Sequence, residues 1–560
     1  MTGSTEKPAI APATTVSAAS APASAPASPA IAPATTVSAA SAPASPAIAS
    51  ATTVSAAASS LVIPPTVTLP MDIHNLLWEI LTFFHKQEKE LGEIYIVGGT
   101  IRDLLLGKTE VLDLDLAVSR SPIASAQRIA HSKNAGFVVL DQEREVARIV
   151  KSLSGKVITV DFARYRAPTI EEDLHDRDFT INALAIKLSW PLLEKQLQIL
   201  DPLGGYDDLK KGLIRPCAEH LFRDDPLRIL RAYRFGATLG FSLVPELDDL
   251  IKRDAPLLKA VSRERIRDEF FKVLSCPNSH HWIRLMSDSG VLREFLPKLD
   301  ATKGVVQNDW HHLDVFDHTL LTLELFEDLL IRQEGGDFWG KVNSFLAEPI
   351  SGTRSYLELF KFGCLLHDIG KPACKKVVEG TGKVIFHGHE MEGVKLVKAI
   401  GESLKLSVAE ILFLQKTVKN HMRPGVILQE LEQKGKDMTD NDRNRLLFRF
   451  FTETGRDGVG IALISLADRL SARGQHQDND LGRFTAEIYN FITSFYQQTE
   501  NTKLPPLLCG TDLITHFRLS PGPAFKEILD SLKEAQALGI VQDHSQAIEY
   551  VSRLLSEKKP

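Results

Sequence analysis

The amino-acid sequence predicts an α+β fold in which a mixed sheet with helices comes first and an all-α region follows. Between residues 94 and 162, short apolar runs bounded by turn residues are typical of strands and are interspersed with helical segments. Beyond residue 206, the segments that carry recognisable patterns are helical. Residues 1–64 are almost entirely Ala, Ser, Pro, Thr and Val in repeated copies, and we expect them to be disordered.

The length of 560 residues predicts several domains. The hydrophobic and charged fractions, 44% and 24%, are ordinary for a soluble protein, and no apolar run approaches a membrane span. With a net charge of −6, nucleic-acid binding requires local basic patches. Five cysteines without paired spacing, and an N-terminus without signal or transit features, indicate the cytoplasm. We divide the chain into a disordered tail (1–64), a head (65–205), a neck (206–275), a helical body (276–500) and a C-terminal tail (501–560).

Apolar periodicity predicts the elements of the head. A helix starts at Met71, with apolar residues at helical spacing. The expected order of elements predicts a mixed, mostly antiparallel sheet with helices on one face. The apolar positions of the first helix are Ile73, Leu76, Leu77, Ile80, Leu81 and Phe84. Strands are expected at 94–97, 111–118, 137–140, 147–150 and 157–162, and helices at 100–106 and 122–134.

The first functional motif joins a Gly-Gly turn to an Asp-x-Asp strand. Gly98 and Gly99 follow a buried strand and let backbone N–H groups approach a polyphosphate. Asp113 and Asp115 point to one face of the second strand, while the leucines between and beside them bury. Two adjacent carboxylates suit Mg²⁺. Alone, Gly-Gly can be an ordinary turn and Asp-x-Asp a solvated strand edge. Together and in this order, they indicate a phosphate and metal site more specifically. Asp161, on the last strand, is either a third acid of this site or a simple strand end.

Two further polar groups follow on expected helices. Arg177, Asp178 and Asn182 lie about one turn apart within residues 171–186, as a nucleotide-contacting face or a charged helix surface. An Arg can grip phosphate and an Asp can accept from a ribose hydroxyl. Residues 201–209 predict a tight turn that feeds a helix and acts as a hinge.

Residues 222–241 predict a basic helix. Asp225 and Arg228, at i and i+3, project from one face, and a carboxylate beside a guanidinium can pair with the edge of cytosine or adenine. Arg231 and Arg234 continue the basic face. The alternative interpretation is a basic helix surface that only contacts solvent. The arginines of residues 262–270 either hold RNA phosphate or brace the preceding helix by ion pairs, and we favour bracing.

The second half carries histidines and aspartates in an ordered series. His318, His367, Asp368 and Asp468 form a ligand set suited to divalent transition metals, with His387, His389 and His421 between them. A single His on a helix is more often structural, but the ordered series is more specific. Residues 335–356 predict a loop inserted in this region, and helices are expected near 524–538 and 545–555.

Together these motifs resemble the bacterial-type (class II) tRNA nucleotidyltransferase and poly(A) polymerase family, whose head is polymerase-β-like, and the histidine series resembles an HD phosphohydrolase domain. The resemblance implies partners tRNA, CTP and ATP, and addition of C, A or both to a tRNA 3′ end. It departs from the family's pattern at Asp176, Asp224 and Phe525-Lys526. The roles implied are two Mg²⁺ at Asp113 and Asp115, triphosphate at Gly98 and Gly99 near Arg102 and Asp103, sugar at Arg177 and Asp178, and base at Asp225 and Arg228.

Three alternatives stay open from the sequence. A poly(A) polymerase shares these motifs, and an HD-type phosphohydrolase with a nucleotide-binding head is a different class of enzyme. Relatives that add the final A carry a flexible loop between the first two motifs. Here only residues 163–170 are available for it, which is short for such a loop, so we expect a CC-adding enzyme and keep a CCA-adding enzyme with a compact loop as an equal alternative. Arg164 and Arg166 can serve as a reduced version of that loop.

Overall fold

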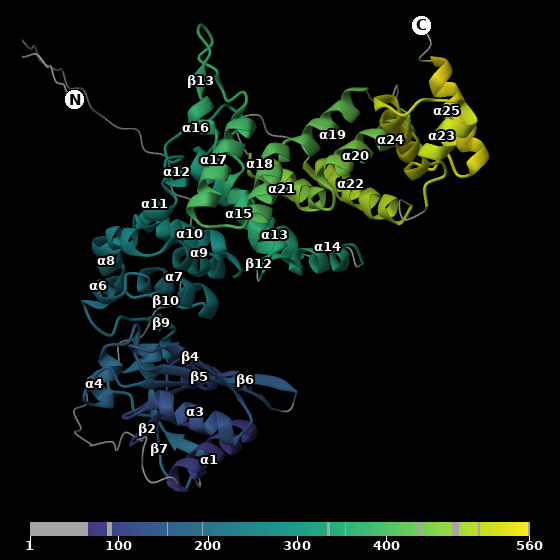
Figure 1. Cartoon of the computed structure of the whole chain (residues 1–560). Coiled ribbons are helices and arrows are strands. Elements are labelled where there is room, and N and C mark those ends of the chain that lie inside the picture. Colours follow the sequence, from purple (N-terminus) through teal and green to yellow (C-terminus); the bar gives the residue numbers. More distant parts are fainter. Residues whose placement is uncertain are drawn as a thin grey trace, which may run out of the picture. The chain divides into compact units, whose positions relative to one another are not determined.

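The computed structural model describes residues 65–86, 92–153, 155–192, 194–332, 337–352, 354–434, 439–472, 481–501 and 505–557 (Figure 1). The expected disorder of residues 1–64 therefore lies outside the described residues. Among the helices that the structure describes, none has both the length and the apolarity to cross a lipid bilayer.

A six-stranded sheet forms the centre of the head, in the order β4-β5-β6-β3-β2-β7. Only β3 and β6 pair in parallel; the other neighbours are antiparallel, as the sequence predicts. The expected strands are all present: β2 has its predicted bounds, β3 is two residues shorter, and β4, β5 and β6 are two to four residues longer than predicted. The bounds are β2 Ile94–Val97, β3 Asp113–Val118, β4 Gly136–Asp141, β5 Val146–Leu153, β6 Lys156–Arg164 and β7 Ala185–Leu188. A separate pair joins β1 Thr66–Thr68 to β8 Gln196–Gln198.

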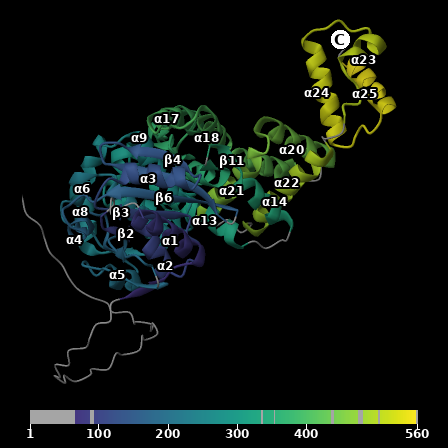
Figure 2. The same ribbon diagram turned by 60° about the horizontal axis from the view of Figure 1, so that its bottom comes forward.

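One face of the sheet packs on α1 (Met71–Lys86), α2 (Gly99–Leu105) and α3 (Pro122–Ser132), and α1 and α3 lie over the same side (Figure 2). All six predicted apolar positions of α1 are buried there. The other face packs Tyr95 and Val97 against α4 (Ile170–His175), so the prediction that helices cover only one face was wrong. Leu112, expected to bury, precedes β3 and is exposed.

The predicted helix over residues 171–186 was wrong beyond His175. The Asp178 carboxylate accepts hydrogen bonds from the Phe179 N–H and the Asn182 amide, and such local bonds compete with a helix. Residues Thr180–Asn182 form a short 3₁₀ turn, and β7 follows at once to complete the sheet edge. Burial of Phe179 in the core favours this path over a solvated helix.

The predicted basic helix over residues 222–241 is two helices, α6 (Leu221–Asp224) and α7 (Arg228–Leu239). Asp225 lies between them in an extended conformation because the residue before a proline, here Pro226, is excluded from helical geometry. Asp225 and Arg228 therefore do not share a helix face, although the Arg228 N–H donates to the Asp225 carbonyl at 3.0 Å.

The predicted turn at residues 201–209 is confirmed. The Asp201 carboxylate accepts from the N–H groups of Gly205 and Tyr206 at 2.8 and 2.9 Å, and α5 (Gly205–Lys211) starts there. A side chain at Gly205 would lie 2.0 Å from the Thr180 carbonyl, so the turn packs directly on the segment that carries Asp178.

The rest of the described chain is helical, with short strand pairs at its loops. The helices are α8 Pro245–Asp254, η2 Ala255–Ala260, α9 Arg263–Leu274, α10 Ser279–Asp288, α11 Val291–Phe295, α12 Pro297–Asp300, α13 Val315–Arg332, α14 Asp337–Ala347, α15 Tyr356–Leu366, α16 Lys371–Cys374, α17 His389–Ser403, α18 Val408–Asn420, α19 Arg423–Lys434, α20 Asp440–Thr454, α21 Asp457–Ser471, α22 Leu481–Asn501, α23 Gly510–Phe517, α24 Pro523–Ala537 and α25 His544–Glu557. The strands are β9 Leu213–Ile214, β10 Ser242–Leu243, β11 Pro349–Ser351, β12 Arg354–Ser355, β13 Lys376–Val377 and β14 Val384–Ile385.

One hydrophobic core runs through the segments predicted as neck and body, and the C-terminal tail has a core of its own. The tail helices α24 and α25 match their predicted positions to within about two residues. The predicted loop over residues 335–356 was wrong for its described part. Trp339, Val342, Phe345 and Leu346 recur at helical spacing in α14 and are buried, with Trp339 packed edge-on against Tyr489.

Candidate functional site

A cleft of about 1650 Å³ opens between the acid-bearing face of the sheet and the helices that follow it. Most of the residues predicted from the first four motifs line it. These are Gly98, Gly99, Arg102, Asp115, Arg177, Asp178, Asn182, Asp225, Arg228, Arg231 and Arg234. Two predicted residues do not line it: Asp113 is exposed at the start of β3, and Asp103 pairs with Arg102 and Lys108.

The acid pair lies on β3 as the strand pattern predicts, with Leu114 and Leu116 buried on the opposite face. Asp161 on β6 lies in register beside Asp115, so the parallel pairing of β3 and β6 adds a third carboxylate. Burial, and after it the charge of Asp161, raise the pKa of Asp115. Three clustered carboxylates are a donor set that suits a hard divalent cation.

Arg148 on β5 holds the third carboxylate. Its guanidinium donates to both oxygens of Asp161, at 2.7 and 2.8 Å, in a bidentate pair. The Thr159 hydroxyl donates to Asp113 at 2.5 Å. Arg148 was not predicted from the sequence, because local sequence patterns do not reveal the strand order that places β5 beside β6.

Gly98 occupies the turn between β2 and α2 with φ of 78°, a conformation that glycine adopts without strain. A side chain at this position would approach the Asp115 carboxylate at 3.2 Å and the Arg177 guanidinium at 3.5 Å. A side chain at Gly99 would meet Arg102 at 3.2 Å. The two glycines therefore keep open the space between the acids and the arginines.

A connected set of polar groups also lines the cleft. Arg102 donates to the Asn182 side-chain oxygen at 2.6 Å, and the Asn182 amide donates to Asp178 at 3.1 Å. Asp178 is buried and accepts from Arg231 at 2.9 Å. Burial alone would raise the pKa of Asp178, but the charge and hydrogen bonds of Arg231 outweigh it and lower that pKa. The motif residues thus fix one another's positions.

Asp225 and Arg228 face the cleft from the break between α6 and α7. Arg265 donates to one oxygen of Asp225 at 2.9 Å, and the Leu227 N–H donates to the other at 3.2 Å. Arg228 donates to the carbonyls of Asp176 and Leu221, at 3.0 and 3.4 Å. Both side chains are held in place before any ligand arrives.

Of the arginines of the 262–270 motif, Arg265 pairs back to Asp225 in the preceding segment, as the bracing interpretation expects, whereas Arg263 and Arg267 take partners elsewhere. Arg263 donates to the Glu294 carbonyl at 3.4 Å, and Arg267 to Asp268 at 2.8 Å. Arg234 on α7 pairs with the buried Glu269 at 3.2 Å and lies 4.2 Å from the Phe235 ring centroid.

The connection from β6 to α4 is short and held at several points. Tyr165 lies 5.9 Å from the Tyr95 ring, and the Arg166 N–H donates to Asp173 at 2.7 Å. The Thr169 hydroxyl caps α4 by accepting from Glu172 at 3.2 Å. Arg166 lines the cleft, a position that the sequence left open.

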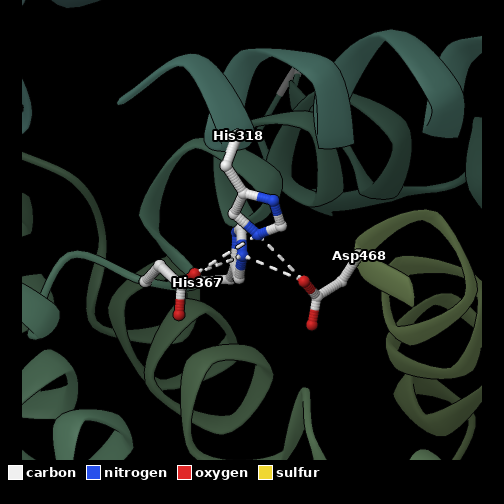
Figure 3. Close-up of side chains that lie close together, drawn as sticks. His318, His367 and Asp468 are labelled. Carbon is white, nitrogen blue, oxygen red and sulfur yellow. Dashed lines mark ion pairs between the residues drawn. The ribbon is translucent and has the colours of Figure 1, made fainter. Parts of the chain in front are cut away.

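The body brings together a second group of candidate ligands. His318, His367, Asp368 and Asp468 place one ligand atom each within 4.8 Å of one another, and the labelled side chains point toward a common centre (Figure 3). The His318 Nε2 lies 3.0 Å from Asp468, and the His367 Nε2 lies 3.1 Å from Asp368. His318, His367 and Asp368 are almost fully buried. The four residues predicted from spacing therefore do meet, and they fit a divalent transition metal.

Backbone contacts orient the ring of His367. Its Nδ1 lies 2.8 Å from the Cys364 carbonyl, which can only accept, so Nδ1 carries the proton and Nε2 is left as a ligand. In the described part of the chain, the buried Nε2 atoms of His318 and His367 have no partner in hydrogen-bond geometry. Burial alone would raise the pKa of Asp368, but His367 and Lys371 lower it well below its usual range.

Comparisons with known proteins match the chain in three segments. A poly(A) polymerase head domain matches residues 94–215, a probable RNA- and SrmB-binding site of polymerase A matches 240–303, and an HD domain matches 315–473. An A-adding tRNA nucleotidyltransferase of Deinococcus radiodurans is 32% identical over 467 residues, covering 82% of this chain and 95% of that protein. A CC-adding tRNA nucleotidyltransferase of Synechocystis sp. is 27% identical over 461 residues, covering 82% and 93%.

A solved structure of a CCA-adding enzyme with ATP is similar to the model at a TM-score of 0.59 and 21% identity, covering 88% of this chain and 96% of that one. At this identity the likeness shows the fold, with a sheet-bearing head followed by helices. Enzymes of this family depend on divalent metal ions, and the chain carries groups of residues that can hold them. The chain belongs to the tRNA nucleotidyltransferase and poly(A) polymerase family and is a nucleotidyltransferase.

Proposed function

We propose that this protein is a template-independent tRNA nucleotidyltransferase that adds C residues to the tRNA 3′ end from CTP, with release of pyrophosphate. The observation that carries the proposal is the cleft itself. Asp115, with Asp161 in register beside it, lines this cleft together with Arg102, Arg177, Arg228 and Arg231, and the space fits a nucleoside triphosphate. The similarity to A-adding and CC-adding relatives over most of their lengths supports tRNA as the acceptor.

Asp113 and Asp115 are the groups that we propose hold Mg²⁺, with Asp161 beside them. Hard carboxylate oxygens on one strand face fit this ion, which also takes substrate phosphates as ligands. When bound, the ions lower the pKa of the RNA 3′-hydroxyl and neutralise the leaving pyrophosphate. Gly98 and Gly99 leave room for the triphosphate beside these acids.

We assign the sugar and phosphate contacts to the arginines and the Asp178 network that line the cleft. Arg177 lies beside Gly98 and pairs with Asp173, which presents its guanidinium toward the triphosphate. Asp178 already accepts from Phe179, Asn182 and Arg231. We therefore propose that Asp178 acts on the sugar mainly by positioning Arg231 and Asn182, with Arg102 and Asp103 behind them.

We propose that Asp225 and Arg228 read the base. A fixed carboxylate accepts from the exocyclic amine of cytosine or adenine, and a fixed guanidinium donates to a ring or carbonyl acceptor. Uracil and guanine present a carbonyl where the amine should be and are excluded. Rigid positioning of both groups, by Arg265 and by backbone carbonyls, is what such discrimination needs.

The choice of C over A rests on the connection between β6 and α4. Five residues, 165–169, link the two elements, and contacts to Tyr95 and Asp173 hold them. Arg164 pairs with Glu145 at 2.8 Å, so it does not lengthen the mobile part of this connection. A short, anchored connection cannot swing to remodel the pocket for ATP. An A-adding and a CC-adding relative both match this chain over more than nine tenths of their lengths, so the choice rests on this connection.

We propose a separate function for each of the predicted domains. The head (65–205) carries the chemistry, the neck (206–275) selects the base, and the body (276–500) carries the HD-type cluster. The C-terminal tail (501–560) binds the tRNA body, and 1–64 takes no part in catalysis. Five unpaired cysteines support a reducing cytoplasm as the compartment.

The proposal is tested by offering each of the four nucleotides separately to a tRNA transcript that lacks its 3′ CCA. CTP alone should extend the transcript by two residues, and an unrelated RNA should not be extended by ATP. A long homopolymer from ATP on the unrelated RNA would instead identify a poly(A) polymerase. Absence of extension with any nucleotide would overturn the assignment.

A further inference from the structure

A third group of candidate ligands lies in the C-terminal tail, outside the cleft and outside the HD-type cluster. Asp512, His516 and His544 place one ligand atom each within 4.8 Å of one another. We propose that these three side chains bind one divalent transition-metal ion, with Zn²⁺ as the ion that fits best, and that the bound ion ties α23 to α25. The proposal is independent of nucleotide addition in the head.

Two of the ligands share one face of α23. Asp512 and His516 are four residues apart, a spacing that makes side chains neighbours on a helix and that is used by helical metal ligands. Between them, Leu513 is fully buried in the core of the tail. Because Leu513 anchors α23 in that core, the face that carries Asp512 and His516 has a fixed direction.

The third ligand comes from the start of α25. His544 is the first residue of that helix, and Val541 and Ala547 on either side of it belong to the same core as Leu513. The centroid of the His544 ring lies 6.0 Å from that of the His516 ring, at an interplanar angle of 69°. Figures 1 and 2 show α23 and α25 gathered with α24 in one small group. Tertiary packing thus brings together ligands that are distant in the sequence.

The Asp512 carboxylate is oriented before any ion binds. Its Oδ2 accepts from the Cys509 N–H at 2.7 Å, in the capping box of α23. In the described part of the chain, no hydrogen bond or ion pair joins this carboxylate to either imidazole. Bonds from Zn²⁺ to nitrogen or oxygen of about 2.0–2.2 Å put tetrahedral ligand atoms about 3.4 Å apart. Modest rotations of the two imidazoles, which are exposed, therefore close the site around an ion.

The donor atoms indicate which ion binds. Two imidazole nitrogens and one carboxylate oxygen suit Zn²⁺, and they leave a fourth tetrahedral position for water. Mg²⁺ prefers an octahedron of oxygen ligands, which this group does not supply. The Cys509 thiol is exposed at the start of α23, but its Sγ lies 2.8 Å from the Thr511 hydroxyl and is not part of the group.

The small size of the tail gives such an ion a physical effect. The tail has a core of its own, made of a few aliphatic side chains and Tyr550. A core of this size contributes little stability, and small domains gain the rest from a metal ion or from disulfides. An ion that binds the folded tail and not the unfolded one shifts the equilibrium toward the folded form.

The first test counts bound ions. Tag-free, full-length protein is dialysed against a buffered concentration of free Zn²⁺, and zinc per chain is measured by elemental mass spectrometry. We expect His516→Ala and His544→Ala each to bind one ion fewer than the wild type, whatever number the other sites bind. His131→Ala, which removes an exposed histidine of α3, is the control and should keep the wild-type number. An unchanged number in both tail variants would overturn the proposal.

The second test locates the effect by hydrogen–deuterium exchange. With free Zn²⁺ at 100 times its Kd, amides of α23 and α25 should exchange up to about 100-fold more slowly in the wild type, because the ion suppresses opening of the tail by that factor. Neither tail variant should show this protection, and Mg²⁺ at the same concentration should give none. Circular dichroism establishes that each variant is folded. Zinc that binds without slowing exchange in α23 and α25 would be an adventitious ion only and would overturn the link between the helices.

Discussion

Asp161 lies directly beside Asp115, because β3 and β6 pair in parallel with these two residues in register. Both oxygens of Asp161 accept from Arg148. The three carboxylates therefore differ in exposure and in pairing. Asp113 is exposed, Asp115 is partly buried, and Asp161 is already neutralised by a guanidinium. The first two remain available for cations, which is why the predictions on chemistry concern them.

Asp113→Ala or Asp115→Ala should abolish nucleotide addition, by on the order of 10³-fold or more, because each removes a carboxylate that we propose holds the cations. The affinity for tRNA should stay within about twofold, since these carboxylates do not contact the RNA body. Single-turnover addition of C and a filter-binding assay measure the two quantities. Full activity of either variant with Mg²⁺ would contradict the site.

Arg228→Ala should reduce the rate and also the discrimination among nucleotides, because we propose that this side chain donates to the base edge. Each lost base contact corresponds to about 1–3 kcal/mol. Competition between CTP and UTP measures the ratio. Arg223→Ala, an exposed arginine on the preceding helix, is the matched control and should leave the ratio unchanged. A variant at Arg228 that is slow but still selective would place base selection elsewhere.

His367→Ala should spare nucleotide addition to within about twofold and should lower metal uptake by the body. The HD-type cluster has its own ligands and its own groove, so its chemistry does not pass through the head. Any metal-dependent phosphatase or phosphodiesterase activity should be lost. If a folded His367→Ala protein cannot add nucleotides, the two activities are not separable.

Glu327→Gln should destabilise the helical body by about 3 kcal/mol, because it leaves Lys361 buried without its counter-charge. Glu327 and Lys361 are 4% and 3% exposed and lie 2.8 Å apart, and Ser279 and His280 also contact the carboxylate. Denaturant unfolding at pH 7 measures the loss. Glu324→Gln, an exposed residue one turn away, is the control and should cost at most about 1 kcal/mol.

The stabilisation by Glu327 should also depend on pH. Burial alone would raise the pKa of Glu327, but hydrogen bonds from His280 and the charge of Lys361 lower it. A lowered pKa in the folded state means that the stabilisation is present above the unfolded pKa of about 4.3 and lost as pH falls through the folded value. The gap between wild type and Glu327→Gln should shrink below about pH 4.3. A gap that widens there would contradict the ion pair.

Patterns local in sequence predicted the parts of this fold that local forces decide. The apolar spacing of α1 and the alternation around Asp115 both matched, since a buried face dictates them. The helix over 171–186 failed because Asp178 bonds its own neighbouring backbone and the chain then joins a sheet. Local sequence patterns do not predict the pairing of β7 with β2, and Arg148 was not predicted for the same reason.

In the histidine series too, local spacing predicted one part of the site and tertiary packing decided the rest. The order His318, His367-Asp368, Asp468 predicted one cluster, because ordered ligands on helices are specific. The approach of the His389 Nε2 to within 3.3 Å of Asp368 depends on how separate segments converge, which spacing alone does not encode.

The central claim, a tRNA nucleotidyltransferase that adds C and stops, is tested most directly on two matched tRNA transcripts. One ends before the CCA and the other already ends in C-C, and each is incubated with CTP or ATP alone. Our account predicts addition of two C residues to the first transcript with CTP and no addition of A to the second, because the anchored 165–169 connection does not reshape the pocket for ATP. Efficient incorporation of A into the transcript that ends in C-C would contradict it.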